Sequence, residues 1–527
     1  MNASDPGLDL RVDTAGIAAL RSDLLAAEYF VPQVEQIIGP LAAAALSRAQ
    51  LLPARDAVQN NLTQPTAALT ALFLLGLEVT NDELGTALPA LGADGAAALG
   101  LVERRGAAPR DGVRALVDLR PYSARDAAGE MDWWIAADLG EEILGAALPA
   151  HHVLGVGGAA KTLAGLTVRD ERHRALDLGT GSGIQMLHLV RHVRHVTGTD
   201  ISARALRYAQ FNLTLNHIAP EQVDLRTGSM FEPVAGEKFD VIVSNPPFVI
   251  TPPDSGLPSY DYRTAAHEAD AVVENLFTSV GCHLNRGGIA QFLGNWEHRG
   301  DQPWHERIDQ WLEAATAAGT PLDAWIVQRE TQDPAQYAET WLADGGAGAK
   351  RDQAAYERAY RAWLKDFASR DVAEIGFGYV LLRRPSDAAS PRIRRFEELS
   401  GRVERPLGGH IAAVLQQIDE TANLDDAQLL AHHFRSAPDV TEERYGAPGA
   451  ADPQMIFVRQ GDGYGRAERV STWQAAFIGA CDGELSAGQI CGALAEIGHL
   501  EVAQVIAEVL PFLREALWQG FITMEQA

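Results

Sequence analysis

The sequence predicts an α/β protein built around a doubly wound, mostly parallel sheet of seven strands, with a flanking module on each side. Two observations predict the sheet: short apolar segments alternate with helical ones from about Arg174, and alternate glycines follow the first of these strands. A third predicts the flanks, because 527 residues exceed what a single hydrophobic core usually serves. We therefore expect three domains, over residues 1–145, 146–388 and 389–527.

The composition excludes several classes of protein. Lys and Arg number 44 against 70 Asp and Glu, and the net charge of −26 repels nucleic-acid backbones and anionic membranes except at a local basic patch. The cysteines Cys282, Cys481 and Cys491 are scattered and odd in number, which argues against disulfide scaffolds and zinc sites. The acidic amino terminus lacks an export pattern, and the apolar stretch at 67–79 is too short to cross a bilayer. We expect a cytoplasmic protein without a metal site or a membrane partner, and the oligomeric state stays open.

The first module reads as helices followed by a β-ribbon. Apolar residues recur with helical spacing over 14–60, and Thr80 with Glu83 forms a capping-box pattern. Two further helices are expected over 67–76 and near 94–104, and two alternating strands over 113–123 and 130–140. Short helices and a ribbon resemble a winged helix. Because acidic residues are frequent here, we favour a packing module over one that binds duplex nucleic acid.

The central domain alternates strands and helices. The expected strands cover 174–178, 195–200, 223–227, 239–245, 288–295, 323–330 and 374–384, and the expected helices cover 182–192, 203–216, 265–284 and 303–318. An aromatic-rich helical insertion at 334–370 precedes the last strand, which could therefore return antiparallel. A linker at 383–392 leads to a C-terminal, mainly helical module whose block at 468–525 could be a second winged helix.

Three alternate glycines follow the first strand of the sheet, in "LDLGTGSG" at 176–183. Gly179, Gly181 and Gly183 let the backbone turn sharply and approach a ligand closely, because each lacks the Cβ that would block it. Their spacing differs from the dinucleotide fingerprint G-x-G-x-x-G, which makes NAD the weaker interpretation. The glycines predict a site for a planar or sugar-bearing ligand at the carboxyl ends of the strands.

Two acidic residues flank this turn. Asp200 ends the second strand, 17 residues after Gly183, where a carboxylate can accept hydrogen bonds from both hydroxyls of a ribose. Asp177 lies two residues before the first glycine and either caps the turn or approaches an amino group of the ligand.

A second glycine-rich stretch, "GVGGAAKT" at 155–162, looks superficially like a phosphate loop. Lys161 follows Ala160, whereas a phosphate loop needs glycine at that place, and no strand leads into the segment. This excludes ATP hydrolysis by a phosphate loop there, and we expect a flexible entry over the ligand pocket instead.

The stretch "FDVIVSNPPF" carries an apolar strand straight into a proline corner. Pro246 and Pro247 fix two φ angles and remove two N–H donors, so the corner offers carbonyl acceptors, to which Asn245 adds a side-chain acceptor. Two such acceptors can hold the N–H bonds of a planar nitrogen while Phe248 covers its π face. Catalysis at that nitrogen would rest on alignment and charge stabilisation, without a metal or a covalent intermediate. The alternative is a rigid strand-to-helix connection.

The stretches "LDLGTGSG", "TGTD" and "NPPF", in this order, resemble the class I S-adenosylmethionine-dependent methyltransferases, in the N-methylating branch with an Asn-Pro-Pro-Tyr or Asn-Pro-Pro-Phe motif. The resemblance covers about residues 150–385 and implies a Rossmann-like domain with S-adenosyl-L-methionine as its cofactor. Within this branch, "NPPFVITPP" is most similar to the HemK/PrmC-type release-factor glutamine methyltransferases.

The resemblance also implies site residues. Those that would bind the cofactor lie in the glycine loop, after the second and third strands and at the proline corner: Asp177, Gly179, Thr180, Gly181, Gly183, Asp200, Ile201, Ser229, Met230 and Asn245. The catalytic residues form the corner itself: Asn245, Pro246, Pro247 and Phe248. Asn245 and Pro246 would grip the nitrogen to be methylated, and Phe248 would stack beside it.

Two positions depart from the branch. Phe248 stands in place of tyrosine, as in NPPF ribosomal-RNA guanine methyltransferases, so the motif leaves amide and base acceptors open. Ser229 stands where relatives often place an acidic residue against the adenine amine. The following loop carries side chains that either close over the acceptor or are solvated: Tyr260, Tyr262, Arg263 and His267.

Three functions therefore stay open. The "VITPP" continuation and the acidic charge favour N-methylation of a glutamine amide in a release factor or another translation protein, which makes a protein the favoured partner. The "NPPF" motif and the winged-helix-like flanks favour N-methylation of adenine or guanine in RNA or DNA, with basic clusters at 191–195 and 391–396 as phosphate contacts. A non-catalytic sensor of S-adenosylmethionine would have no need of Asn245.

Overall fold

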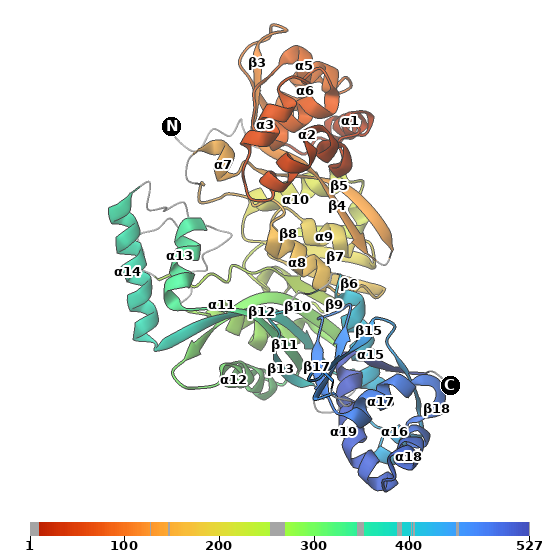
Figure 1. Cartoon of the computed structure of the whole chain (residues 1–527). Helices are drawn as coiled ribbons and strands as arrows, with labels where there is room; N and C mark the ends of the chain where they lie inside the picture. The colour runs from red at the N-terminus through yellow and green to blue at the C-terminus, as the bar shows by residue number, and fades with distance from the viewer. Residues whose placement is uncertain are drawn as a thin grey trace. The chain divides into compact units, whose positions relative to one another are not determined.

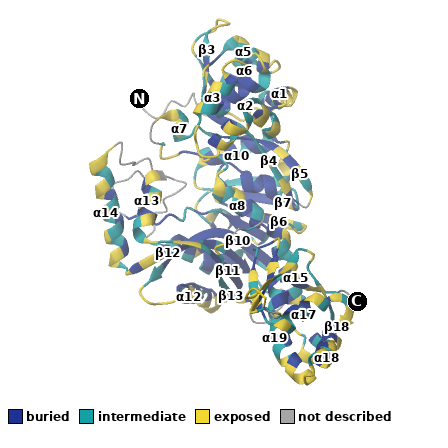
Figure 2. Cartoon of the chain, viewed as in Figure 1, coloured by how far each residue is buried: buried dark blue, intermediate teal, exposed yellow. Residues whose placement is uncertain are grey.

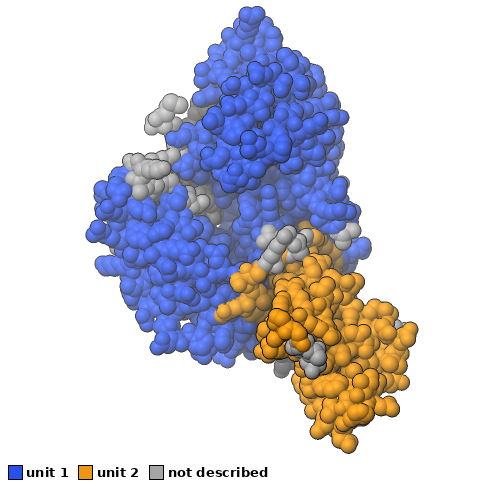
Figure 3. Space-filling model, in the orientation of Figure 1, with its two compact units in different colours: residues 1–164, 171–396 blue, residues 165–170, 397–527 orange. Residues whose placement is uncertain are grey.

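The computed structural model describes residues 10–126, 128–145, 148–252, 269–344, 352–386, 393–401, 403, 406–449 and 453–525. The chain divides into two compact units, residues 1–164 with 171–396 and residues 165–170 with 397–527 (Figure 3). Residues 1–145 share a unit with the large sheet, and the domain boundaries at 145/146 and 388/389 stay predictions. Within the described ranges, no helix combines the length and the apolar character needed to cross a membrane.

The large sheet of the first unit has eight strands in the order β13-β11-β12-β10-β9-β6-β7-β8 (Figure 1). They are β6 (Arg172–Leu178), β7 (Val193–Asp200), β8 (Val223–Thr227), β9 (Phe239–Ser244), β10 (Leu284–Arg299), β11 (Asp323–Gln332), β12 (Val372–Arg383) and β13 (Arg394–Glu398). Strands β8, β7, β6, β9 and β10 pair in parallel, and β12 is antiparallel to both β10 and β11. The predicted doubly wound, Rossmann-like sheet is confirmed, including the returning last strand. The difference is an eighth strand, β13, which covers backbone groups of β11 that would otherwise form an open edge.

Four helices connect these strands within the predicted ranges: α9 (Ile184–Leu189), α10 (Ala203–Leu215), α11 (Ala271–Ser279) and α12 (Trp304–Ala317). The predicted start of the third helix, at 265, lies outside the described residues. Right-handed crossovers put α9 and α10 on one face of the sheet and α11 and α12 on the other, where Phe277 and Trp311 join one core. Because both faces are covered, the strands are buried (Figure 2), and a ligand can reach the sheet only at the strand ends.

The N-terminal part packs short helices beside a small sheet. The helices are α1 (Thr14–Ala26), α2 (Val31–Leu46), α3 (Leu52–Val58), α4 (Pro65–Leu69) with a π-helical turn at Thr70–Leu74, α5 (Asn81–Ala87) and α6 (Gly92–Ala98). The sheet has the order β1-β3-β2, from Val79–Thr80, Gly112–Ala115 and Val102–Arg104. The capping box is confirmed: Thr80 N–H donates to Glu83 Oε2 at 2.7 Å, and Glu83 N–H donates to Thr80 Oγ1 at 3.2 Å.

The predicted ribbon is present but begins later than expected. Its strands are β4 (Val117–Asp126) and β5 (Gly129–Asp138), which pair antiparallel along their whole length. The single strand predicted over 113–123 was wrong, because Leu116 N–H turns away to donate to Leu101 O at 2.9 Å. Strand β3 therefore ends before it, in the other sheet.

Two asparagines, Asn212 on α10 and Asn216 directly after it, join the ribbon to the large sheet. Asn212 Oδ1 accepts from Ala136 N–H at 2.8 Å, and its Nδ2 donates to Ala136 O at 2.9 Å and to Ser182 O, within the glycine turn, at 2.8 Å. Asn216 bonds Trp134 N–H and C=O in the same way, at 3.0 and 2.8 Å. Apolar side chains of α10 also complete the core of the N-terminal helices.

The remaining helices lie outside the alternation of strands and helices in the sheet. A short helix α7 (Glu141–Leu144) follows the ribbon, and α13 (Pro334–Asp344) and α14 (Gln353–Ser369) form the predicted insertion between β11 and β12. The prediction of a flexible segment over 155–162 was wrong for residues 158–162, because these belong to helix α8 (Gly158–Leu166). Its first turn is stabilised because Gln185 Nε2 donates to Ala160 O at 2.8 Å.

The second unit is mainly helical, as predicted, with two small sheets. Its helices are α15 (Gly408–Thr421), α16 (Asp426–Ala431), α17 (Thr472–Ala480), α18 (Ala487–Gly498) and α19 (Val502–Gln519). The sheets are β18-β14-β19, from Asp482–Ser486, His433–Ser436 and Ile522–Met524, and β15-β16-β17, from Val440–Tyr445, Met455–Gln460 and Ala467–Val470. Cys481 and Cys491 are free and lie in its core, where burial raises their pKa values to about 12 and about 11.

Replacing Asn212 tests the link between ribbon and sheet. Asn212→Ala leaves the buried N–H and C=O groups of Ala136 without these partners, and we expect the free energy of unfolding to fall by about 2–4 kcal/mol in urea denaturation. Gln210→Ala, on the same helix, is the matched control, because the Gln210 side chain bonds Thr214 of its own helix, and its loss should cost less than about 1 kcal/mol. Equal losses in the two variants would contradict the link.

Candidate active site

Strands β6 and β9 end side by side in the middle of the sheet. Leu178 lies opposite Ser244 in the parallel register, and Ser244 Oγ donates to Leu178 O at 2.8 Å. From these two strands the chain winds outward in opposite directions, which is where open α/β sheets form a binding crevice. The glycine turn leaves one strand and the proline corner leaves the other, so the structure brings the two sequence-predicted groups to one edge.

The glycine turn is closed by hydrogen bonds to the end of β7. The N–H groups of Gly179 and Thr180 both donate to Thr199 O at 2.9 Å. Gly179 and Gly181 have φ values of 76° and 53°, and a Cβ on either would meet nothing within 4 Å. Gly183, at φ 87°, instead packs against α10, where its Cβ would lie 3.1 Å from Ala209 Cα. The first two glycines therefore face open space, and the third allows close packing of helix against turn.

Asp200 joins the turn to the end of β7. Its Oδ2 accepts from Gly181 N–H at 2.9 Å and its Oδ1 accepts from Ser202 N–H at 2.8 Å, which fixes the carboxylate at the rim of the turn. The side chain is only partly buried, and the neighbouring Ile201 is 65% exposed. A carboxylate and an exposed apolar side chain thus lie together on the side from which a ligand can approach.

Asp177 is buried under the glycine turn. Its Oδ2 accepts a hydrogen bond from Thr180 Oγ1, whereas its buried Oδ1 has no hydrogen-bond partner among the described residues. Burial raises the pKa of Asp177 to about 7; hydrogen bonds from Thr180 and Met186 oppose this shift, and the charge of Asp200 adds to it. The carboxyl is therefore poised to ionise near neutrality.

The end of β8 places Ser229 and Met230 beside Asp200. Gly228 N–H donates to Asp200 O at 3.0 Å, which brings the following two residues to the same rim. Ser229 is exposed, and Met230, at φ 47°, packs partly against the sheet's core. Ser229 and Met230 are thus placed where they can contact a planar ring of a ligand, although neither side chain is acidic.

The proline corner is a tight turn with a buried, unused acceptor. Phe248 N–H donates to Pro246 O at 2.8 Å, which turns the chain directly after the strand. Asn245 Oδ1 is buried and has no hydrogen-bond partner among the described residues. Pro247 has no N–H with which to fill it, and Phe248 packs against the core while its ring meets Trp341 edge-on at 6.5 Å between centroids. Within the described part of the chain, the corner thus keeps one buried acceptor that no donor fills.

Sequence reasoning missed the insertion's contribution to this edge. Tyr337 and Trp341 of α13 lie next to the residues that follow the corner, and Asn295 on β10 bonds Tyr337. The aromatic-rich composition of 334–370 was the available signal, but it did not say what these rings contact. The loop side chains Tyr260, Tyr262, Arg263 and His267 lie outside the described residues.

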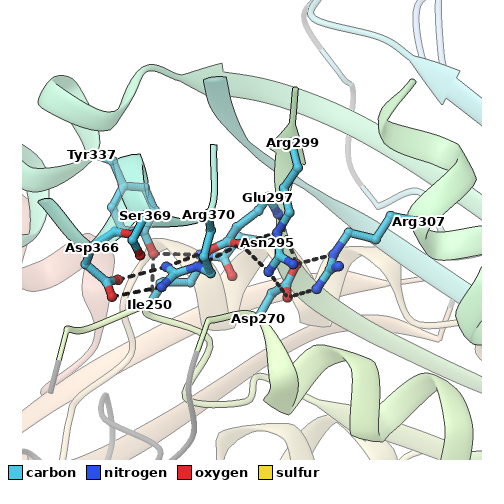
Figure 4. Close-up of polar contacts among 10 residues, drawn as sticks. All are labelled: Ile250, Asp270, Asn295, Glu297, Arg299, Arg307, Tyr337, Asp366, Ser369 and Arg370. Atoms are coloured by element: carbon cyan, nitrogen blue, oxygen red, sulfur yellow. Dashed lines mark hydrogen bonds and ion pairs between the residues drawn. The ribbon is translucent and has the colours of Figure 1, made fainter. Parts of the chain in front are cut away.

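A buried network of charges joins the insertion to the sheet (Figure 4). Glu297, at the end of β10, accepts from Arg299 Nε at 2.8 Å and from Arg370 Nη2 at 2.8 Å, and Arg370 also bonds Asp366 of α14. Asp270, before α11, bonds Arg307 Nη2 at 2.6 Å and the Glu297 N–H at 3.1 Å. Each buried carboxylate has an arginine partner, as a buried charge requires. No group of three or more His, Cys, Asp or Glu in the described part of the chain is arranged to hold a metal ion.

The buried carboxyl of Asp177 gives a testable pH dependence. Its folded-state pKa of about 7 lies above its ordinary value, so the folded protein keeps a proton that the unfolded chain loses, and the stability falls as pH rises from about 4 to about 7. Asp177→Asn does not titrate. In urea denaturation we expect the variant to gain stability relative to the unmutated protein between pH 5 and pH 8. A difference that does not change with pH would contradict a raised pKa.

Two protein families match parts of the chain. Residues 157–313 match "Methyltransferase small domain", and residues 26–116 match "Domain of unknown function (DUF7059)". The first range contains the glycine turn, Asp200, the end of β8 and the proline corner.

Individual relatives match the same region. The release factor glutamine methyltransferase of Aliivibrio fischeri is 37% identical over 125 residues, which are 23% of this chain and 43% of that protein. The ribosomal RNA small subunit methyltransferase C of Haemophilus influenzae is 34% identical over 124 residues, which are 23% of this chain and 32% of that protein. The chain thus spans less than half the length of these curated relatives.

One solved structure matches the chain at low similarity. The T. Thermophilus 16S rRNA N2 G1207 methyltransferase, in complex with AdoMet and guanosine, is 15% identical over 63% of this chain and 69% of its own, with a TM-score of 0.27, which is too low to support an argument about function. The strand topology and the matching family instead carry the assignment. Residues 157–313 thus match a methyltransferase domain, and the sheet has the strand order of a Rossmann-like fold.

Proposed function

We propose that this protein is an S-adenosylmethionine-dependent N-methyltransferase whose acceptor is a planar nitrogen, the side-chain amide of a glutamine in a translation protein such as a release factor. The observation that carries the proposal is the Asn245 Oδ1 atom, a buried acceptor without a partner among the described residues, at the strand end next to the glycine turn. A buried acceptor left unpaired costs stability, so its retention indicates that a donor from a substrate fills it.

The residues on the glycine side fit the cofactor. The open space over Gly179 and Gly181 accepts a ligand against the backbone, and Asp200 offers its carboxylate to ribose hydroxyls. Asp177 Oδ1, for which the described residues offer no hydrogen-bond partner, suits the ammonium group, and Met230 with Ile201 would line the adenine ring. When bound, S-adenosylmethionine supplies a methyl group carried on a sulfonium.

The proline corner would do the chemical work of alignment. Asn245 Oδ1 and the second lone pair of Pro246 O accept the two N–H bonds of a primary amide, which orients the nitrogen and leaves its own lone pair directed out of the corner. As charge grows on the nitrogen its N–H bonds become stronger donors, so these two hydrogen bonds strengthen in the transition state. Phe248 covers one face of the amide and excludes water.

The charge of the chain supports a protein acceptor. At −26, the protein offers no general attraction for phosphate backbones, and an amide on a protein side chain needs none. The relative named a release factor glutamine methyltransferase supports the amide as the acceptor group. A cytoplasmic location belongs to this proposal, because translation proteins are there.

A nucleobase is the second candidate acceptor. The relative named a ribosomal RNA small subunit methyltransferase and the phenylalanine at 248 favour it. An exocyclic amine of guanine or adenine presents the same two N–H bonds to Asn245 and Pro246, so the corner alone does not choose. Selection between an amide and a nucleobase must therefore come from the residues around the corner and from the rest of the chain.

Removing the proposed acceptor tests the catalytic role. Asn245→Ala should lower methyl transfer at least about 100-fold, while the dissociation constant for S-adenosylmethionine changes less than about threefold, because Asn245 acts chiefly on the acceptor. Isothermal titration measures the cofactor, and incorporation of labelled methyl measures transfer. Asn285→Ala is the matched control. Asn285 lies at the opposite end of these strands, where its Nδ2 donates to Asp240 Oδ1 at 2.8 Å.

The acceptor is identified with two probes, a purified bacterial release factor and purified small ribosomal subunits. Label in the release factor that stays after nuclease treatment and is localised to a glutamine supports the amide. Label released by nuclease supports the base instead. Cofactor binding with no transfer to either probe or to a whole lysate would overturn the enzymatic proposal in favour of a sensor.

A further inference from the structure

The proline corner is held firmly at both of its ends. At its start, β9 is paired with β6 and Ser244 Oγ bonds Leu178 O. At its far end, Ile250 is 1% exposed, and its N–H donates to Tyr337 Oη at 2.9 Å. This second bond comes from the helical insertion, 87 residues further along the chain.

Tyr337 has little freedom to move. Its ring is fully buried, stacks on Phe377 of β12 at 5.7 Å and meets Phe367 of α14 edge-on at 5.5 Å. Its hydroxyl accepts a second hydrogen bond from Asn295 Nδ2 on β10 at 2.7 Å (Figure 4). Tyr337 is therefore held against two strands of the large sheet, against β10 through its hydroxyl and against β12 through its ring.

The insertion itself is anchored by charge. Arg370, just after α14, bonds Glu297 Oε1 and Asp366 Oδ2, both at 2.8 Å, and Glu297 is fully buried (Figure 4). Breaking one side of a buried pair leaves an uncompensated charge, which makes this attachment costly to release. Helices α13 and α14 therefore form a rigid support and not a loose flap.

One face of α13 contacts the proline corner and the residues after it with two side chains. Tyr337 and Trp341 are four residues apart, so their side chains project from the same side of the helix. The first holds the Ile250 amide, and the second lies edge-on to Phe248 at an interplanar angle of 76°. The ring that would cover the acceptor and the backbone that carries it are thus both supported from the insertion.

We propose that Tyr337 is a positioning residue for the methyl acceptor: by holding the Ile250 N–H it fixes the chain after Phe248 and so keeps Asn245 Oδ1 and Pro246 O aimed at the acceptor nitrogen. The inference rests on the proposed function for its kinetic consequence. Its structural content, that the hydroxyl fixes the corner, is measured separately.

Tyr337→Phe removes only the hydroxyl, and Tyr29→Phe is the matched control. Tyr29 is also fully buried, and its hydroxyl donates to Leu119 O at 3.0 Å, far along the chain from the corner. Tyr29→Phe loses one buried hydrogen bond and Tyr337→Phe loses two, from Ile250 and Asn295, so the urea midpoint should fall further in Tyr337→Phe. Under conditions where both variants stay folded, an effect found only in Tyr337→Phe reflects the place of the hydroxyl and not the loss of stability.

Hydrogen–deuterium exchange measures how firmly the backbone of the corner is held, and it needs no methyl acceptor. A peptide over residues 245–251 is informative because Pro246 and Pro247 carry no amide hydrogen, which leaves Phe248, Val249, Ile250 and Thr251 to report. We expect exchange in this peptide to be at least about tenfold faster in Tyr337→Phe and unchanged in Tyr29→Phe. Unchanged exchange in Tyr337→Phe would overturn the proposal.

Kinetics with the acceptor that the unmutated protein methylates gives the second reading. We expect kcat of Tyr337→Phe to fall at least about tenfold, with the KM for S-adenosylmethionine within about twofold, and Tyr29→Phe to keep both values. Equal kcat losses in the two variants would reduce Tyr337 to a purely structural residue. If the unmutated protein transfers no methyl group to any probe, the proposed function fails, whereas the exchange result still decides whether Tyr337 fixes the corner.

Discussion

The ligand edge depends on one constraint, that two neighbouring parallel strands end at the same level. Leu178 and Ser244 are register partners, and the Ser244 hydroxyl closes the pair by bonding Leu178 O. A slip of one residue in β9 would turn the serine to the other face and displace the proline corner from the glycine turn. The side chains of the glycine turn and of the proline corner can act on one ligand only because this strand pairing brings the two loops to the same edge of the sheet.

The two loops are stiffened by the same device, a side chain that takes over backbone hydrogen bonds from a distant segment. Asn212 holds Ser182 in the glycine turn, and Tyr337 holds Ile250 after the corner. Neither loop is part of a regular element whose own bonds would fix it. Polar groups on rigid helices therefore provide the precision that a site on loops otherwise lacks.

The sequence predicted well those features that short stretches encode. Alternate glycines need positive φ values, and Gly179 and Gly181 have them in open space, so the position of the turn followed from the strand before it. The split at Leu116 could not be foreseen, because its N–H bonds Leu101, and alternation alone does not tell which sheet a strand joins. The partners of Ile250 and Glu297 could not be predicted either. Tyr337 and Arg370 lie 87 and 73 residues away from them along the chain, and no local sequence pattern records such pairs.

Helix α10 contacts both the large sheet and the N-terminal helices. One side packs on the sheet, while Tyr208, Phe211 and Leu215 complete the core of the N-terminal helices. During synthesis, residues 10–145 leave the ribosome before this helix exists, so their apolar side chains wait for a partner that arrives some 70 residues later, at Leu215. Residues 10–145 therefore become fully packed only after α10 has been made, and a fragment that stops before α10 would expose the surface that this helix covers.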